Sequence, residues 1–201
     1  MAVRKRVALD VDFTVADIGS VMLRLHNAEV SGSYTMDDIV DWSWESVKMT
    51  SEQFVDAYVR AWNEYMQDIP IAMDVSLLRS AQKLYDIELV TSRKNSGRFE
   101  STVGALRGWM DLNGIGDLPL VLSNAHEHKS NLDYDFFIDD SPALARAMSE
   151  CSGNGKVLFI VDAPYNREVN DSANVFRVRN ADDALMRLAS LAGSPSAPKH
   201  E

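Results

Sequence analysis

Short apolar runs recur along the chain, separated by segments in which apolar residues return every three or four positions. Runs of this length are typical of buried strands. The predicted strands cover residues 6–10, 87–91, 118–122, 135–139, 157–161 and 174–178. Helical spacing is clear between most of them, as in Phe99, Val103, Leu106 and Met110. Because strands alternate with helices, the pattern predicts an α/β fold with a parallel sheet and helices on both faces.

The segment between residues 17 and 73 breaks this alternation, because it contains no convincing strand. Predicted helices cover residues 16–28, 51–67 and 74–84. The second ends before Pro70 and shows no capping box at Ser51. We therefore divide the chain into an α/β core of residues 1–17 and 73–192, a small helical cap of residues 18–72, and a flexible tail of residues 193–201.

Carboxylate pairs follow two of the predicted strands. Asp10 and Asp12 follow the first strand, with Thr14 two residues further on, and Asp139 and Asp140 end the fourth. The carboxyl ends of parallel strands meet at one edge of a sheet, so we expect these side chains to converge. An Asp-x-Asp pair alone is more often a turn or a solvated pair. Converging carboxylates invite a divalent cation, and one of them can act as a nucleophile.

Two further polar residues complete an ordered set. Thr91 ends the second predicted strand, and Lys129 lies in the loop before the fourth, where Lys156 is a less well-placed alternative. The order Asp-x-Asp-x-Thr, Thr, Lys, Asp-Asp resembles the haloacid dehalogenase-like (HAD) phosphohydrolase superfamily. The resemblance covers the chain from Val7 to about Leu191. It implies a Rossmann-like core with a small helical cap inserted after the first strand.

The resemblance also implies a role for each catalytic member of the set. Asp10 would attack phosphorus to form an aspartyl phosphate, and Asp12 would serve as general acid and then general base. Thr91 would bind the phosphoryl oxygens, helped by Ser92. Lys129 would neutralise charge on the nucleophile and the phosphate.

The implied cofactor is Mg²⁺, because oxygen ligands alone suit this ion and carboxylates converging without a cation would repel one another. The predicted metal ligands are Asp10, Asp12 through its backbone carbonyl, Asp139 and Asp140. Asp139 is the better candidate for direct ligation. Asp140 either binds through water or caps the helix that starts near Pro142.

Within the superfamily the chain most resembles the 5′(3′)-deoxyribonucleotidase branch. The cap and the segments Pro164-Tyr165-Asn166 and Arg177-Val178 carry this likeness. Phe13 departs from the branch, because a glycine is common at that position. The implied activity is hydrolysis of a small phosphate ester, a nucleoside monophosphate. A sugar phosphate or other metabolite as substrate, a non-catalytic binding module, and a phosphatase of nucleic-acid ends remain alternatives.

The candidate substrate-binding residues outside the catalytic set are Ser92, Arg93, Trp42 and Trp44. Arg93 could meet a second phosphate or simply solvate the start of a helix. Trp42 and Trp44 lie in an irregular, acid-flanked segment, where they could stack a nucleobase or pack inside the cap. Core packing is the favoured interpretation for three aromatic residues that share one helical face: Phe54, Tyr58 and Trp62.

Composition narrows the function classes. The net charge of −10 and the pI of about 4.8 argue against binding of a nucleic-acid polymer. The single cysteine, Cys151, excludes an intramolecular disulfide and a Cys-rich zinc site, and His126 and His128 are expected in an exposed loop. Without a signal peptide or an apolar run near 18 residues, we expect a cytoplasmic protein without membrane contact. The oligomeric state stays open, a homodimer included.

Overall fold

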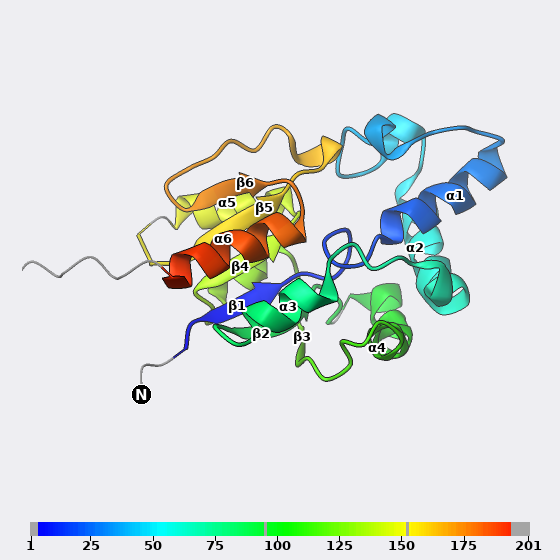
Figure 1. Ribbon diagram of the computed structural model, residues 1–201. Coiled ribbons are helices and arrows are strands. Elements are labelled where there is room, and N and C mark those ends of the chain that lie inside the picture. Colours follow the sequence, from blue (N-terminus) through cyan, green and yellow to red (C-terminus); the bar gives the residue numbers. More distant parts are fainter. Residues whose placement is uncertain (1–3, 95, 152, 194–201) are drawn as a thin grey trace, which may run out of the picture.

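The computed structural model describes residues 4–94, 96–151 and 153–193, and a parallel sheet lies at its centre (Figure 1). The strands in these residues are β1 (Arg6–Leu9), β2 (Asp86–Thr91), β3 (Leu120–Leu122), β4 (Phe136–Asp139), β5 (Val157–Val161) and β6 (Val175–Val178). Their order in the sheet is β3-β2-β1-β4-β5-β6, and all neighbours pair in parallel. The chain reverses its direction of travel across the sheet between β1 and β4. This is the topological switch point of a Rossmann-like fold, where ligands bind.

Helices cover both faces of the sheet, as the alternation of elements predicts. Val7 and Leu9 of β1 belong to one apolar cluster, together with α3 (Val75–Ala81) and α6 (Ala181–Gly193). Ala8 belongs to a second cluster, together with α5 (Pro142–Glu150). Successive strand side chains point to opposite faces, so each strand contributes to both clusters.

The helical segment between β1 and α3, which we call the insert, lies beyond the carboxyl ends of the strands (Figure 1). It contains α1 (Ile18–Val30), α2 (Ser51–Tyr65) and the short 3₁₀ turns Met36–Asp38, Glu45–Val47 and Met66–Asp68. The two chain segments that join it to the core run antiparallel, with a bridge between Ala16 and Ile71. The backbone N–H of Ala72 donates to the carbonyl of Val15 at 2.7 Å. The chain therefore leaves the core and re-enters it at one place.

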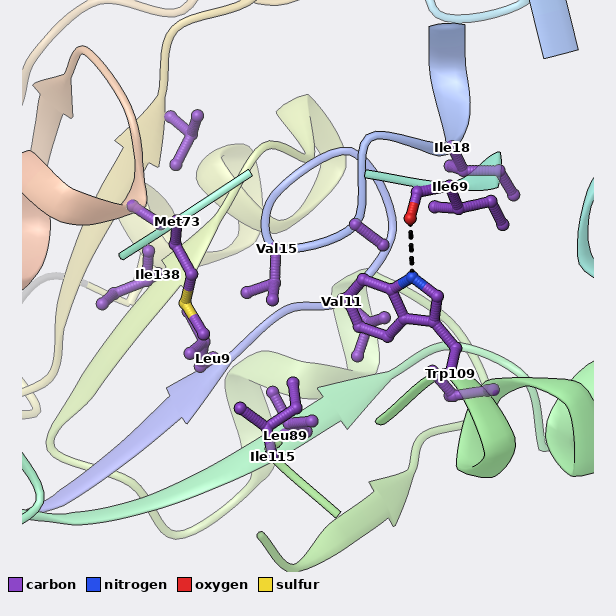
Figure 2. Close-up of a cluster of buried hydrophobic side chains, with 14 of the residues drawn as sticks. Leu9, Val11, Val15, Ile18, Ile69, Met73, Leu89, Trp109, Ile115 and Ile138 are labelled. Carbon is purple, nitrogen blue, oxygen red and sulfur yellow. Dashed lines mark hydrogen bonds between the residues drawn. The ribbon is translucent and has the colours of Figure 1, made fainter. Parts of the chain in front are cut away.

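The junction between the insert and the core is buried (Figure 2). Trp109 of α4 (Val103–Leu112) is only 1% exposed, and its indole Nε1 donates to the carbonyl of Ile69 at 2.9 Å. Figure 2 shows this bond beside Val11 and Val15 of the loop after β1. The loop that carries the candidate nucleophile is thus packed on its apolar side.

Several element boundaries differ from those predicted. The helix predicted over 16–28 starts at Ile18, because the Asp17 side chain caps it by accepting from Ser20 N at 3.1 Å. Helix α2 begins with a capping box that the sequence reading missed, in which Thr50 and Gln53 exchange side-chain to backbone hydrogen bonds. The remaining shifts are small: β1 ends at Leu9, β2 starts at Asp86, β3 starts at Leu120, β4 starts at Phe136, β6 starts at Val175, α2 ends at Tyr65, and α3 covers Val75–Ala81.

The predicted tail lies outside the described residues, except for Gly193 at the end of α6. Within the described ranges, no helix combines the length and the apolar character needed to cross a membrane.

Candidate active site

A buried ion cluster lies where β1 and β4 end side by side. Leu9 pairs with Ile138 across the two strands, so Asp10 and Asp139 follow as neighbours. Lys129 reaches between them from the 3₁₀ turn Glu127–Asn131, with Nζ 2.5 Å from Asp10 Oδ1 and 2.7 Å from Asp139 Oδ2. The Asp10, Lys129 and Asp139 side chains are each at most 3% exposed. Acidic and basic residues this deeply buried require partners, and here they partner one another.

Asp140 completes a group of three buried carboxylates. It is 1% exposed and accepts hydrogen bonds from the Tyr165 hydroxyl at 2.5 Å and from Thr14 Oγ1 at 3.4 Å. The side-chain amide of Asn166 donates to its backbone carbonyl at 2.8 Å. Helix α5 is capped instead by Ser141, which accepts from Leu144 N, so Asp140 is not the capping residue.

The three carboxylates suit a divalent cation. One oxygen each of Asp10, Asp139 and Asp140 can be chosen so that all three lie within 4.8 Å of one another. Lys129 offsets only one of these negative charges. Burial raises the pKa of Asp10 well above its usual value; Lys129 opposes this rise and the neighbouring carboxylates add to it. Burial, followed by the charge of Asp139, raises the pKa of Asp140 to about 7. An oxygen-ligated cation such as Mg²⁺ would remove this excess negative charge, so the residues present fit the ion.

The Asp12 carboxylate points away from this cluster and accepts hydrogen bonds from four side chains. Tyr58 Oη and Trp62 Nε1, both on α2, donate to it at 3.0 Å each. Thr91 Oγ1 donates at 3.0 Å, and Arg93 Nη2 donates to its two oxygens at 2.6 and 2.9 Å. Burial would raise the pKa of Asp12, but the Arg93 charge and these hydrogen bonds lower it below its usual value. The Asp12 side chain is therefore ionised and lies outside the cluster of three carboxylates, so only its backbone carbonyl could serve as a metal ligand.

The sequence left two roles open for Arg93, contact with a second phosphate and solvation of a helix start. The structure supports neither role. The Arg93 side chain is 1% exposed, and Nη1 donates to Thr102 Oγ1 at 2.8 Å. The guanidinium also lies over the rings of Trp62 and Tyr58, at 4.5 and 5.4 Å from their centroids. Both terminal nitrogens of Arg93 are thus bonded, Nη2 to Asp12 and Nη1 to Thr102.

A cavity of about 310 Å³ lies between the insert and the carboxyl ends of the strands. Its polar floor includes Asp10, Asp12, Thr91, Ser92 and Asp140. Its walls include the aromatic residues Phe13, Trp42, Phe54, Tyr58 and Phe99, together with His126. Among the described residues that line it there is no lysine or arginine. The cavity therefore presents apolar rings above a floor of hydroxyls and carboxylates.

The two candidate tryptophans have different environments. Trp42 lines the cavity, is 37% exposed, and packs edge-on against His126 and Tyr165 with ring centroids 5.3 Å apart in each case. Trp44 is 2% exposed, packs on Phe13 and is not among the residues lining the cavity. Trp44 therefore belongs to the core of the insert, and its interpretation as a substrate-binding residue is corrected. His126 is partly buried in the cavity wall rather than exposed.

Comparison with known families supports the resemblance described above. Residues 4–190 match the model of the family described as 5′ nucleotidase, deoxy (pyrimidine), cytosolic type C protein, NT5C. The chain belongs to this family. It is an HAD-like hydrolase, as the ordered set of motifs predicts, and it falls in the nucleotidase branch, as the Pro-Tyr-Asn and Arg-Val segments indicate. No curated protein matches the chain significantly.

Solved structures show the same fold at low sequence identity. An HAD-like hydrolase from Burkholderia xenovorans is 13% identical, with a TM-score of 0.56, and the match covers 96% of this chain and 100% of that one. The hydrolase YfnB from Bacillus subtilis, solved with bound magnesium, is 14% identical, with a TM-score of 0.53 and coverage of 94% and 100%. CbbY from Rhodobacter sphaeroides, solved with xylulose-1,5-bisphosphate, is 13% identical, with a TM-score of 0.53 and coverage of 90% and 96%.

The structure assigns contacts to residues whose function the sequence left open. Asn166 links β5 to β4 by donating to the carbonyls of Val161 and Asp140 at 2.8 Å, and its Oδ1 accepts from Arg177 at 2.7 Å. Tyr165 and Asn166 of the Pro-Tyr-Asn segment thus hold Asp140 by hydrogen bonds, and Arg177 of the Arg-Val segment holds Asn166. Tyr58 and Trp62 were interpreted as packing residues because they share a helical face. Their polar atoms bind Asp12 at the same time.

Proposed function

We propose that the protein is a Mg²⁺-dependent phosphomonoesterase that hydrolyses nucleoside monophosphates through an aspartyl phosphate on Asp10. The observation that carries this proposal is the buried Asp10 carboxylate, which Lys129 holds at the floor of a cavity with aromatic walls. The family match supports a nucleotidase. The insert would act as the cap predicted from the sequence, and the cytosolic type named in the family description supports a cytoplasmic location. A homodimer stays a prediction.

In the proposed mechanism, a carboxylate oxygen of Asp10 forms a bond to phosphorus while the bond from phosphorus to the ester oxygen breaks. Asp12 gives to the departing oxygen the proton that it removed from water in the preceding turnover. In the second step Asp12 removes a proton from water as the water oxygen attacks phosphorus, which restores Asp10 and releases phosphate. The ionised state of Asp12 in the structure corresponds to the base of this second step. Thr91 and Ser92 would contact the phosphoryl oxygens, and Lys129 would offset charge on the nucleophile.

Asp10, Asp139 and Asp140, with the backbone carbonyl of Asp12, would hold Mg²⁺. The ion supplies positive charge to a transferring phosphoryl group when bound. The protein's own contribution is to keep these oxygens together in a buried place, with Tyr165 and Asn166 fixing Asp140.

The cavity favours a substrate with one phosphate and an uncharged ring. Aromatic walls suit a nucleobase, and the described residues that line the cavity include no cation for a second phosphate. A sugar bisphosphate, the kind of molecule bound to CbbY, would place its second phosphate in a cavity whose described lining has no lysine or arginine. We therefore favour nucleotides over sugar bisphosphates.

The test is phosphate release from a panel of nucleoside 5′- and 3′-monophosphates and sugar phosphates, measured with Mg²⁺ and with EDTA. We expect release that depends on Mg²⁺ and is greatest with one or a few nucleotides, because the ring fills the aromatic cavity. Release from sugar phosphates alone would reject the nucleotide assignment and keep the mechanism. No release from any ester would reject the enzyme assignment in favour of a binding module.

Phe13 offers a second test of the cavity. Its φ of 64° is left-handed, a conformation that costs a non-glycine residue about 1 kcal/mol or more, and its ring lines the cavity. Phe13→Ala and Phe13→Gly both remove the ring, so we expect each to raise KM for the preferred nucleotide several-fold. Only the glycine variant also removes the strain, so urea unfolding should show it to be about 1 kcal/mol more stable than the alanine variant. An unchanged KM in both variants would contradict a role of Phe13 in the substrate wall.

A further inference from the structure

The Asp12 carboxylate is held jointly by the two parts of the molecule. Thr91 and Arg93 approach it from the end of β2 in the core, and Tyr58 and Trp62 approach it from α2 of the insert. Tyr58 and Trp62 are four residues apart, so they lie one above the other on the same face of the helix. Trp62 donates to Asp12 Oδ1 and Tyr58 donates to Asp12 Oδ2, so the insert contacts both carboxylate oxygens.

Arg93 orders the two donors as well as their acceptor. Its guanidinium bonds both Asp12 oxygens and lies over the rings of Trp62 and Tyr58. The second terminal nitrogen, Nη1, donates to Thr102 Oγ1 at 2.8 Å. The side chains in contact are therefore those of Asp12, Arg93, Tyr58 and Trp62. Displacement of α2 would remove two of the donors that orient the Asp12 carboxylate.

We propose that Tyr58 and Trp62 are positioning residues for proton transfer, which orient the Asp12 carboxylate toward the ester oxygen of the substrate. This inference rests on the proposed function. An acid transfers its proton only within hydrogen-bond reach and at a suitable angle, so a carboxylate free to rotate is a poorer catalyst. Trp62 orients Asp12 from outside the cavity, since it is not among the residues that line the cavity. The position of α2 against the core and the orientation of the acid are then coupled.

The test uses the leaving group of the substrate. A nucleoside alkoxide must be protonated as it leaves, whereas p-nitrophenolate leaves without a proton. The ratio kcat/KM includes only steps up to the cleavage of the ester bond, so it isolates this proton transfer from the later hydrolysis. We expect Trp62→Phe and Tyr58→Phe to lower kcat/KM for the preferred nucleoside monophosphate about tenfold. For p-nitrophenyl phosphate the same variants should change kcat/KM by less than about twofold.

Two matched control variants remove the same groups elsewhere. Trp109 is as buried as Trp62, but its indole donates to the carbonyl of Ile69. Tyr85 is as buried as Tyr58, and its hydroxyl donates to the carbonyl of Leu188. Any effect of Trp109→Phe or Tyr85→Phe comes from packing and from the loss of a hydrogen bond that does not involve Asp12, so it should fall equally on the two esters.

A double-mutant comparison isolates the route through Asp12. Asp12→Asn should show the same preference for the aryl ester, with a larger loss on the nucleotide. Adding Trp62→Phe to Asp12→Asn should then lower nucleotide turnover no further, because the group that Trp62 positions is already absent. Fully multiplicative losses would overturn the inference.

The outcomes separate this inference from the proposed function. A wild-type protein that releases no phosphate from either ester overturns both. An active wild type whose Trp62→Phe and Tyr58→Phe variants lose equal activity on the two esters, or lose none, overturns the positioning role alone. Selective loss on the nucleotide supports both.

Discussion

Asp10→Asn is expected to lower phosphate release from the preferred ester by at least about a thousandfold, or roughly 4 kcal/mol of transition-state stabilisation. An amide oxygen is a poor nucleophile, and the aspartyl phosphate cannot form on it. The fold should persist, because asparagine has nearly the same shape and Lys129 retains Asp139 at 2.7 Å. Circular dichroism and steady-state phosphate release measure the two effects separately.

The intermediate gives a direct check on this result. Wild-type protein quenched in acid during turnover of a phosphate-labelled ester should carry the label, and the Asp10→Asn variant should carry none. Asp133→Asn is the matched control, because it makes the same chemical change in a side chain that is fully exposed. Full turnover by the Asp10→Asn variant would contradict the proposed nucleophile.

Lys129→Met is expected to lower the free energy of unfolding by about 3–5 kcal/mol without Mg²⁺. The substitution removes the buried cation between Asp10 and Asp139 and leaves three carboxylates close together. An ion that binds these carboxylates in the folded state should restore part of the loss. We therefore expect urea unfolding to show a larger gain from Mg²⁺ in the variant than in the wild type, together with a strong loss of turnover.

Lys156→Met provides the comparison for this prediction. The Lys156 ammonium donates at 2.8 Å to the carbonyls of Ser130 and Leu132, in the segment that follows Lys129, and neither partner is a carboxylate. Its loss should cost about 1–2 kcal/mol, with no dependence on Mg²⁺. Equal destabilisation of the two variants would show that Lys129 does not compensate the carboxylate cluster.

The structure brings Asp10, Lys129, Asp139 and Asp140 together. Lys129 precedes β4, so its place in the cluster was expected only from the family resemblance, whereas the convergence of the three carboxylates could be predicted from the strand pattern. The reason is that parallel strands place all their carboxyl ends at one edge. Locating the apolar runs therefore locates the side chains that follow them. The helices α1 and α2 could be predicted for a similar reason, since a long segment without strand periodicity cannot extend the sheet. The role of this segment as a cap stays a prediction.

The surroundings of Asp12 could not be predicted in this way. Arg93, Tyr58 and Trp62 lie 46 to 81 residues from it in the chain, and nothing local in the sequence shows where their polar atoms point. Helical periodicity assigned Tyr58 and Trp62 to an apolar face, yet a phenol or an indole can pack its ring and bond through its polar atom together. For Arg93 the sequence likewise showed only a positive charge. Its pairing with Asp12 follows from the folded structure, which buries the two side chains next to each other.

The sequence also could not distinguish Trp42 from Trp44, because both lie in the same irregular, acid-flanked segment. The left-handed backbone at Trp44 and the packing of its ring on Phe13 place it in the core, while Trp42 reaches the cavity. Periodicity and strand ends are local properties of the chain, so the fold class and the carboxylate cluster could be predicted from the sequence alone. Side-chain directions across distant elements arise only when those elements pack, so the partners of Asp12 and the walls of the cavity belong to the folded molecule.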